Sequence, residues 1–146
     1  MAKVSIYLNF QSNTEEAFNF YKSAFQTEFI GPIMYMKDIP AQDGMPALPE
    51  NEQNSVMHIC LPILGGTQLM GTDMLESMGH QLRIGNNTSI NLEPDSREET
   101  ERLFTALSDG AKDVMPLQDM FWGAYWGSFL DKYGIRWMFN YAEQNH

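Results

Sequence analysis

The chain has 146 residues, close to the usual size of one domain, so the first expectation is a single compact protein. Apolar residues make up 43% and charged residues 19% of the sequence, a globular composition that excludes wholesale disorder. Nine Lys and Arg residues against 19 Asp and Glu residues give a net charge of -10, which disfavours nucleic acid and anionic membrane surfaces as partners.

The first predicted elements are a strand and a helix. The opening VSIYLNFQ is rich in β-forming residues. It is followed by two spacings typical of a capped helix start, Ser12 with Glu15 and Asn13 with Glu16. Aromatic and alanine side chains then recur every three or four residues, which predicts a helix over 14–26 with one buried stripe.

A further strand, a long loop and a hairpin complete the first half. TEFIGPIMYM has a strand-like pattern, and residues 37–53 then bring three prolines. A loop of this length is either a flap over a site or mobile surface. The segment NSVMHICLPIL alternates between two faces, with His58 and Cys60 on one of them. Gly65 and Gly66 predict a tight turn, after which TQLMGTD returns as the partner strand.

The second half repeats the order of elements. The strand TSINLEP is followed by Ser96 with Glu99, a second capping signature, and Gly110 is placed to end the helix that follows. Three more strands are predicted in AKDVMPLQD, FWGAYWGSFL and IRWMFNY, the last two joined across Asp131 to Gly134. Each half therefore reads β, α, β, β, β, and the segment between them has no clean period. A helix covering one face of each sheet leaves the other face free, so we predict an α+β fold with a cleft.

Three segments carry a resemblance to a known family: YLNFQSNTEEAFNFYKSAF, VMHICLPILGGTQLMGTD and FWGAYWGSFLDKYGIRWMFN. The chain resembles the PhnB-like branch of the glyoxalase, bleomycin-resistance and extradiol-dioxygenase superfamily, also called vicinal oxygen chelate proteins. The resemblance implies one glyoxalase-like domain over 1–146, built from two βαβββ modules at about 1–75 and 86–146 with a crossover at 76–85. It also implies a curved mixed sheet with a cleft, homodimers and, in catalytic members, a divalent metal on the inner face of the sheet.

The metal site implied by the resemblance is degenerate in this sequence. His58 matches one ligand position of the catalytic relatives, which carry a His or Glu on each of four strands. The other three positions match Ser89, Met138 and either Ile6 or Tyr7, none of which is a convincing ligand. A metal at His58 would need other side chains to turn inward; the candidates are Glu93, Asp73, Asn9 and Asn91. The alternatives for His58 are a hydrogen-bonded strand residue and a polar group that orients a ligand.

Aromatic residues near the C-terminal strands are the main candidates for a pocket wall. Phe121, Trp122, Tyr125 and Trp126 lie close to Gly123 and Gly127, although core packing and dimer contact explain such a cluster equally well. The predicted ligand-binding residues are Tyr7, His58, Trp122 and Tyr125. No catalytic residue is assigned.

Other residues have simpler interpretations. Arg136 either neutralises an anionic substrate or pairs with an acid on the surface, and Arg97 is placed to pair with Glu101. The 11 methionines fill either an adaptable pocket or an irregular core. No nucleophile elbow, phosphate-binding glycine loop or dinucleotide fingerprint is present.

Cys60 is the single cysteine of the sequence and is expected to be inert. With one cysteine, no export signal at the N-terminus and no apolar run of about 20 residues, we expect a cytoplasmic protein that does not span a membrane.

The functional prediction is a homodimeric protein that binds an unidentified small molecule in the cleft. Two alternatives stay open. One is a metal-dependent isomerase, lyase or dioxygenase of the same superfamily, and the other is a resistance-type protein that sequesters a drug without chemistry. No cofactor is evident apart from a possible divalent metal.

Overall fold

The computed structural model describes residues 1–40, 44 and 46–143. The chain divides into two compact units, Met1–Arg83 and Ile84–His146, within the segment predicted to connect the two modules. The predicted flap over 37–53 falls partly on residues 41–43 and 45, which lie outside the described residues.

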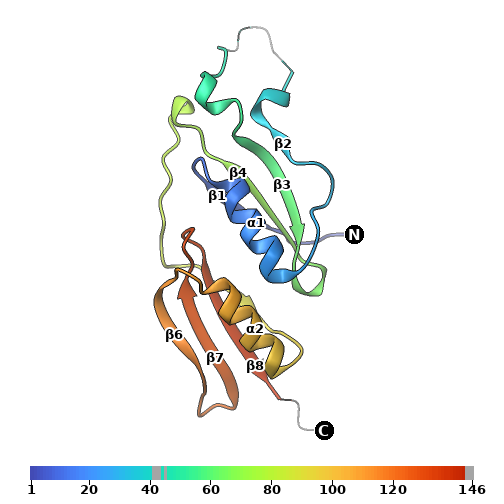
Figure 1. The fold of residues 1–146 in the computed structure, drawn as a ribbon, viewed down its shortest axis with the longest axis vertical. Helices are drawn as coiled ribbons and strands as arrows, with labels where there is room; N and C mark the ends of the chain where they lie inside the picture. The colour runs from blue at the N-terminus through green and yellow to red at the C-terminus, as the bar shows by residue number, and fades with distance from the viewer. Residues whose placement is uncertain (41–43, 45, 144–146) are drawn as a thin grey trace. The chain divides into compact units, whose positions relative to one another are not determined.

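Unit 1 is a four-stranded mixed sheet with one helix (Figure 1). Its elements are β1 (Ile6–Phe10), α1 (Thr14–Phe25), β2 (Met34–Tyr35), β3 (Val56–Pro62) and β4 (Gln68–Asp73). The strand order is β1-β4-β3-β2, in which β1 is parallel to β4 and the other neighbours are antiparallel. In its described residues, the loop between β2 and β3 contains two short 3₁₀ helices, Met36–Asp38 and Glu50–Glu52.

The helix α1 covers one face of this sheet (Figure 1). Leu8 of β1, Gly71 of β4 and Ile59 of β3 are in register across the three strands. A Cβ atom added to Gly71 would lie 2.5 Å from the Phe18 ring of α1, so this row faces the helix. The neighbouring row, Tyr7, Met70 and Cys60, alternates with it and faces the other way. We call the side that carries this second row the open face.

The start of α1 differs from the prediction. Asn13 precedes the helix but its side chain makes no capping hydrogen bond, and Ser12 donates its hydroxyl to the carbonyl of Gln11. Instead, Asp73 Oδ1 at the end of β4 accepts from the backbone N–H of Thr14 at 3.2 Å and from its hydroxyl at 2.6 Å. The predicted cap is therefore wrong, because a buried carboxylate from a distant strand supplies the acceptor that the helix start needs.

Unit 2 repeats the same topology. Its elements are β5 (Ile90–Leu92), α2 (Arg97–Leu107), β6 (Lys112–Asp119), β7 (Ala124–Leu130) and β8 (Arg136–Ala142). The strand order β5-β8-β7-β6 corresponds position by position to that of unit 1, with β5 parallel to β8 and the other neighbours antiparallel. The predicted α+β fold made of two βαβββ modules is confirmed.

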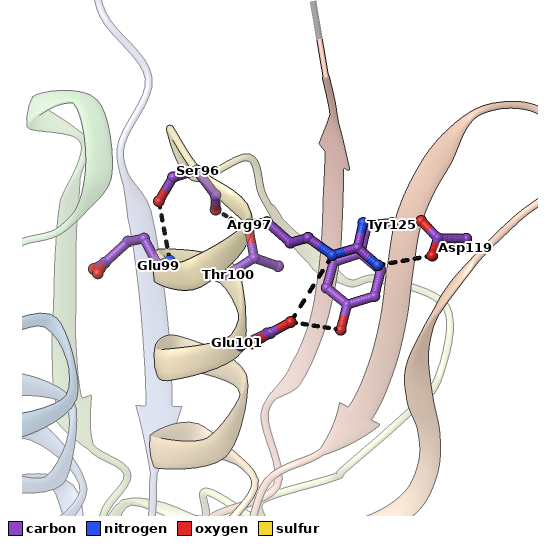
Figure 2. A network of polar contacts seen from close by, with 7 residues as sticks. All are labelled: Ser96, Arg97, Glu99, Thr100, Glu101, Asp119 and Tyr125. Carbon is purple, nitrogen blue, oxygen red and sulfur yellow. Dashed lines mark hydrogen bonds and ion pairs between the residues drawn. The ribbon is translucent and has the colours of Figure 1, made fainter.

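In unit 2 the predicted helix cap is present. Ser96 Oγ accepts a hydrogen bond of 3.1 Å from the backbone N–H of Glu99 (Figure 2). Phe104 of α2 then packs its ring against Phe129 of β7 and Phe139 of β8, with centroids 5.0 and 5.3 Å away. These contacts identify the face of the second sheet that α2 covers. In the part of the chain that the structure describes, no helix has the length and hydropathy needed to cross a bilayer.

Candidate functional site

Tyr7 and His58 come together on the open face of unit 1. The phenol oxygen of Tyr7, on β1, lies 3.2 Å from Nδ1 of His58, on β3, and the two ring centroids are 5.9 Å apart. Tyr7 is 48% exposed. Partial burial raises the pKa of Tyr7, so the phenol keeps its proton at neutral pH and can donate to Nδ1. In that arrangement, neutral His58 carries its ring proton on Nε2.

A cavity of about 870 Å³ lies in the same unit. Its wall is formed by β1, β3 and β4 residues, the loop after β2 and the segment after β4; the lining residues are Asn9, Met36, Lys37, Ile39, Pro40, Pro46, Ala47, Leu48, Gln53, Met57, Thr72, Asp73, Met74, Leu75, Met78 and His80. Most are apolar, and four are methionines. Tyr7 and His58 are not among these lining residues, but Asn9 and Thr72, which alternate onto the same open face, are.

His80 presents a fixed hydrogen-bond donor at this cavity. Its Nδ1 accepts a hydrogen bond of 3.0 Å from the backbone N–H of Leu75. A backbone N–H can only donate, so Nδ1 is the acceptor and the proton of the neutral ring is on Nε2. An Nε2–H group cannot ligate a metal, but it can donate to an oxygen of a bound molecule.

The carboxylate in the cavity wall is already engaged. Asp73 is 5% exposed, and its Oδ1 accepts from Thr14 as described above. Its Oδ2 accepts from the backbone N–H of Val56 at 2.8 Å. These hydrogen bonds give Asp73 a structural role in holding α1, β3 and β4 together.

The side chains around His58 do not fit a catalytic divalent metal within unit 1. Among residues 1–40, 44 and 46–143, no three His, Cys, Asp or Glu side chains form a group suited to a metal ion. Of the possible extra ligands, Asp73 is hydrogen-bonded to α1 and β3, while Asn91 and Glu93 belong to unit 2. Cys60 is buried, and burial raises the pKa of its thiol, so it stays protonated at neutral pH.

Trp122 lies in the turn between β6 and β7 of unit 2 and is not among the residues that line the cavity of unit 1. It is 53% exposed, and its neighbour Phe121 is 98% exposed. The two rings meet edge to face with centroids 5.1 Å apart. Trp122 belongs to unit 2, whereas Tyr7 and His58 belong to unit 1.

Tyr125 lies on the face of the second sheet that α2 covers, not on the opposite face. Figure 2 shows its ring beneath the guanidinium of Arg97, whose Cζ is 3.8 Å from the ring centroid. The Tyr125 hydroxyl donates to Glu101 Oε1 at 3.0 Å, and Arg97 donates to both oxygens of Asp119 at 3.0 and 2.7 Å. These groups engage one another, so Tyr125 connects α2 to the sheet.

The charges in this cluster shift the pKa values of its members. The hydrogen bond from Arg97 lowers the pKa of the Asp119 carboxyl. The same contact raises the pKa of Arg97. Burial, followed by the hydrogen bond to Glu101, raises the pKa of Tyr125. The predicted Arg97–Glu101 pair is present at 4.0 Å, and the surface interpretation of Arg136 is supported by its 3.4 Å ion pair with Asp113.

Sequence reasoning did not single out Lys37 or His80 as cavity residues. One follows β2 in the long loop and the other follows β4 in the connecting segment, and nothing in their local patterns indicates that these two segments meet. The one available signal was the frequency of methionine, since Met36, Met57, Met74 and Met78 all line the cavity.

Comparisons with known proteins agree with this architecture. A family model described as 3-demethylubiquinone-9 3-methyltransferase matches residues 2–139. Protein YjdN of Escherichia coli (strain K12) is 29% identical over 146 residues, covering 97% of this chain and 96% of that protein. The crystal structure of protein PA1353 from Pseudomonas aeruginosa is 31% identical, with a TM-score of 0.82 over 99% of this chain and 100% of that chain.

Two further structures relate the fold to a superfamily. A putative 3-demethylubiquinone-9 3-methyltransferase, PhnB protein, from Bacillus cereus is 25% identical, with a TM-score of 0.74 over 97% of this chain and 100% of that one. A glyoxylase/bleomycin resistance protein/dioxygenase domain from Frankia sp. EAN1pec is 11% identical, with a TM-score of 0.64 over 98% and 99% of the two chains. At that identity the second likeness concerns the fold alone.

Proposed function

The chain belongs to the 3-demethylubiquinone-9 3-methyltransferase family, a PhnB-like branch of the glyoxalase/bleomycin resistance/dioxygenase superfamily, and we propose that it binds an apolar small molecule in unit 1. The observation that carries this proposal is the cavity of about 870 Å³, whose wall is mostly apolar and includes Asn9 and Thr72 of the open face. Ligand sites of small molecules have volumes of roughly 300–1,000 Å³, mostly apolar walls and a few polar groups. The cavity matches all three features.

Within this proposal, His58 orients the ligand and does not hold a metal. Its partner is the Tyr7 phenol, which fixes the ring and leaves Nε2–H as a donor when Tyr7 donates to Nδ1. The superfamily's metal site is degenerate in this proposal, because the positions of its other ligands match Ser89, Met138 and either Ile6 or Tyr7. Trp122 and Tyr125, predicted from the sequence to contact the ligand, are not needed for this site.

The test of binding is a substitution that fills the cavity. Asn9→Trp places a large ring at a lining position, and Ser5→Trp places the same ring on the same side of the chain before β1, outside the lining residues. A library of small apolar compounds is screened by thermal shift against the original chain. Compounds that raise its melting temperature are expected to lose that effect with Asn9→Trp and to keep it with Ser5→Trp. Equal responses of all three proteins would count against the cavity as the binding site.

The superfamily also contains metal-dependent isomerases, lyases and dioxygenases, and His58 keeps one ligand position for such chemistry. Metal analysis of protein purified without chelator distinguishes this alternative. About one divalent ion per chain, lost in His58→Ala, would favour the metal enzyme over the binding protein.

The description of the family names a methyl transfer, which requires a methyl donor. The sequence contains no glycine-rich fingerprint of the kind that cradles a nucleotide cofactor, so methyl transfer is not part of the proposal. Calorimetric titration with S-adenosylmethionine tests this directly, and saturable binding would bring methyl transfer back.

The proposal includes a homodimer as the working form. It is supported by the exposed aromatic side chains of Phe121 and Trp122 at the β6–β7 turn, a composition typical of interface residues. Sedimentation equilibrium should give about twice the mass of one chain, and Phe121→Ser with Trp122→Ser should lower that mass if the turn contributes to the interface.

A further inference from the structure

We infer that the ligand of the unit 1 cavity is an organic anion, an apolar molecule that carries a carboxylate. This inference rests on the proposed function and adds the chemical class of the ligand. It is based on the hydrogen-bonding state of the polar groups in the cavity wall and on the distribution of acidic residues around it.

The cavity wall supplies two hydrogen-bond donors, His80 and Lys37. His80 Nδ1 is occupied by the Leu75 N–H, so the ring offers a neutral Nε2–H donor at the cavity. Lys37 is the cationic member of the lining, and its ammonium group lies 5.6 Å from the ring centroid of Tyr35. Lys37 and His80 are both exposed, so each can donate a hydrogen bond to an oxygen atom of a bound molecule.

Three carboxylates near the cavity accept hydrogen bonds from the protein itself. Asp73 accepts from Thr14 and Val56, and Asp38 Oδ2 accepts from the backbone N–H of Tyr35 at 3.0 Å. Glu52, in the adjoining 3₁₀ helix, accepts from both the backbone N–H and the hydroxyl of Ser77. These three carboxylates therefore have donors of their own within the protein. The hydroxyl hydrogen of Thr72 is also engaged, since it donates to the Val56 carbonyl at 3.2 Å.

The open face contributes Asn9 and Thr72 to the cavity wall, so its charge matters for the ligand. The positions that alternate onto the open face are Ser5, Tyr7, Asn9, Met34, Val56, His58, Cys60, Pro62, Gln68, Met70 and Thr72. None is acidic, although the chain contains 19 Asp and Glu residues. The open face offers a cationic ligand no carboxylate, and the Asp73 carboxylate of the cavity wall is 5% exposed and already accepts from Thr14 and Val56. An anion meets the His80 donor and the Lys37 ammonium group of the cavity wall.

The inferred ligand therefore has two parts, an apolar body and a carboxylate. The apolar body contacts the thioethers of Met36, Met57, Met74 and Met78, which adapt to irregular shapes. The carboxylate accepts from His80 Nε2–H and Lys37, in charge-assisted hydrogen bonds that are stronger than neutral ones.

The experiment uses three probes with the same ring system: 2-naphthoate, 2-naphthalenemethanol and 2-naphthylmethylammonium. Calorimetric titration of the full chain should give the tightest binding for 2-naphthoate, by roughly tenfold over the alcohol. Lys37→Met and His80→Asn should each weaken 2-naphthoate about five- to tenfold and leave the alcohol unchanged. His80→Asn keeps an acceptor for the Leu75 N–H, and Lys22→Met, on α1, is the control for loss of one positive charge.

Each outcome bears on a different statement. Equal or tighter binding of the alcohol overturns the inferred anion while leaving small-molecule binding in place. Tightest binding of the ammonium probe also overturns it and points to sequestration of a cationic compound. If no probe binds to the chain, or if Asn9→Trp binds all three unchanged, the proposed cavity site fails as well. Circular dichroism of each variant verifies that it is folded.

Discussion

The indole Nε1–H of Trp137 donates a hydrogen bond of 2.8 Å to Oδ2 of Asp131, and both side chains are buried. The other oxygen of Asp131 accepts from the backbone N–H groups of Tyr133, at 2.8 Å, and Ile135, at 3.0 Å. One carboxylate thus shapes the turn between β7 and β8 and connects it to the Trp137 ring in the core of unit 2. Gly134 in this turn has a φ of +91°, a conformation that favours glycine.

Asp131→Ala is expected to lower the free energy of unfolding by about 3 kcal/mol, because three donors lose their acceptor and one of them is buried. Asp109→Ala is the matched control, since Asp109 forms an exposed ion pair of 3.7 Å with Lys132 that is worth at most about 0.5 kcal/mol. Urea unfolding followed by Trp fluorescence measures both. Similar losses in the two variants would contradict the structural role of Asp131.

Gly71→Ala is expected to destabilise unit 1 by about 2–3 kcal/mol through overpacking. The added Cβ would lie 2.5 Å from Cε1 and 2.9 Å from Cζ of Phe18, and this ring is fully buried. Gly85→Ala is the control, because the nearest atom to its added Cβ is 3.7 Å away. Thermal unfolding by circular dichroism compares the two, and Phe18→Leu combined with Gly71→Ala should recover part of the loss. An unchanged melting temperature for Gly71→Ala would show that α1 does not pack as described.

Arg97→Met should make the stability of unit 2 less dependent on acid pH. Arg97 lowers the pKa of Asp119 in the folded state, so the contact stabilises the fold above the unfolded pKa and this stabilisation is lost as pH falls through the folded pKa. The variant should be less stable than the original chain at neutral pH, and the difference should shrink between about pH 5 and about pH 2. Urea unfolding at a series of pH values measures it. A difference that is constant with pH would mean that the Asp119 carboxylate does not contribute.

His58 is expected to carry its proton on Nε2 when neutral, and ¹⁵N NMR at alkaline pH reports this tautomer through the ring nitrogen shifts. The reason is the Tyr7 phenol, which donates to Nδ1. His80 serves as the reference within the same spectrum, because the Leu75 N–H fixes its tautomer. Tyr7→Phe should shift the His58 signals toward a mixture of tautomers and leave those of His80 unchanged. A dominant Nδ1–H form of His58 in the original chain would instead leave Nε2 free to ligate a metal.

Local patterns in the sequence predicted the order of the helices and strands, but not the cap of α1 or the shortness of β2. Ser96 caps α2 through Glu99 as the spacing indicated, Gly65 and Gly66 have the positive φ values of a turn, and the β, α, β, β, β order occurs in both units. These features depend on residues that are close in the chain, where periodicity and capping chemistry act directly. The resemblance to the superfamily added the two-module topology, which the strand orders of the two sheets confirm.

Which face of a strand meets which neighbour was decided only by the tertiary structure. Alternation along β7 separates Tyr125 from Trp126, but it does not tell which of them meets α2; the register of β7 with β6 and β8 assigns Tyr125 to Arg97 and Glu101. In the same way Asp73, 59 residues away in sequence, replaces the predicted side-chain cap at Thr14. The meeting of Lys37 and His80 at one cavity likewise depends on how two irregular segments pack, which no local period encodes.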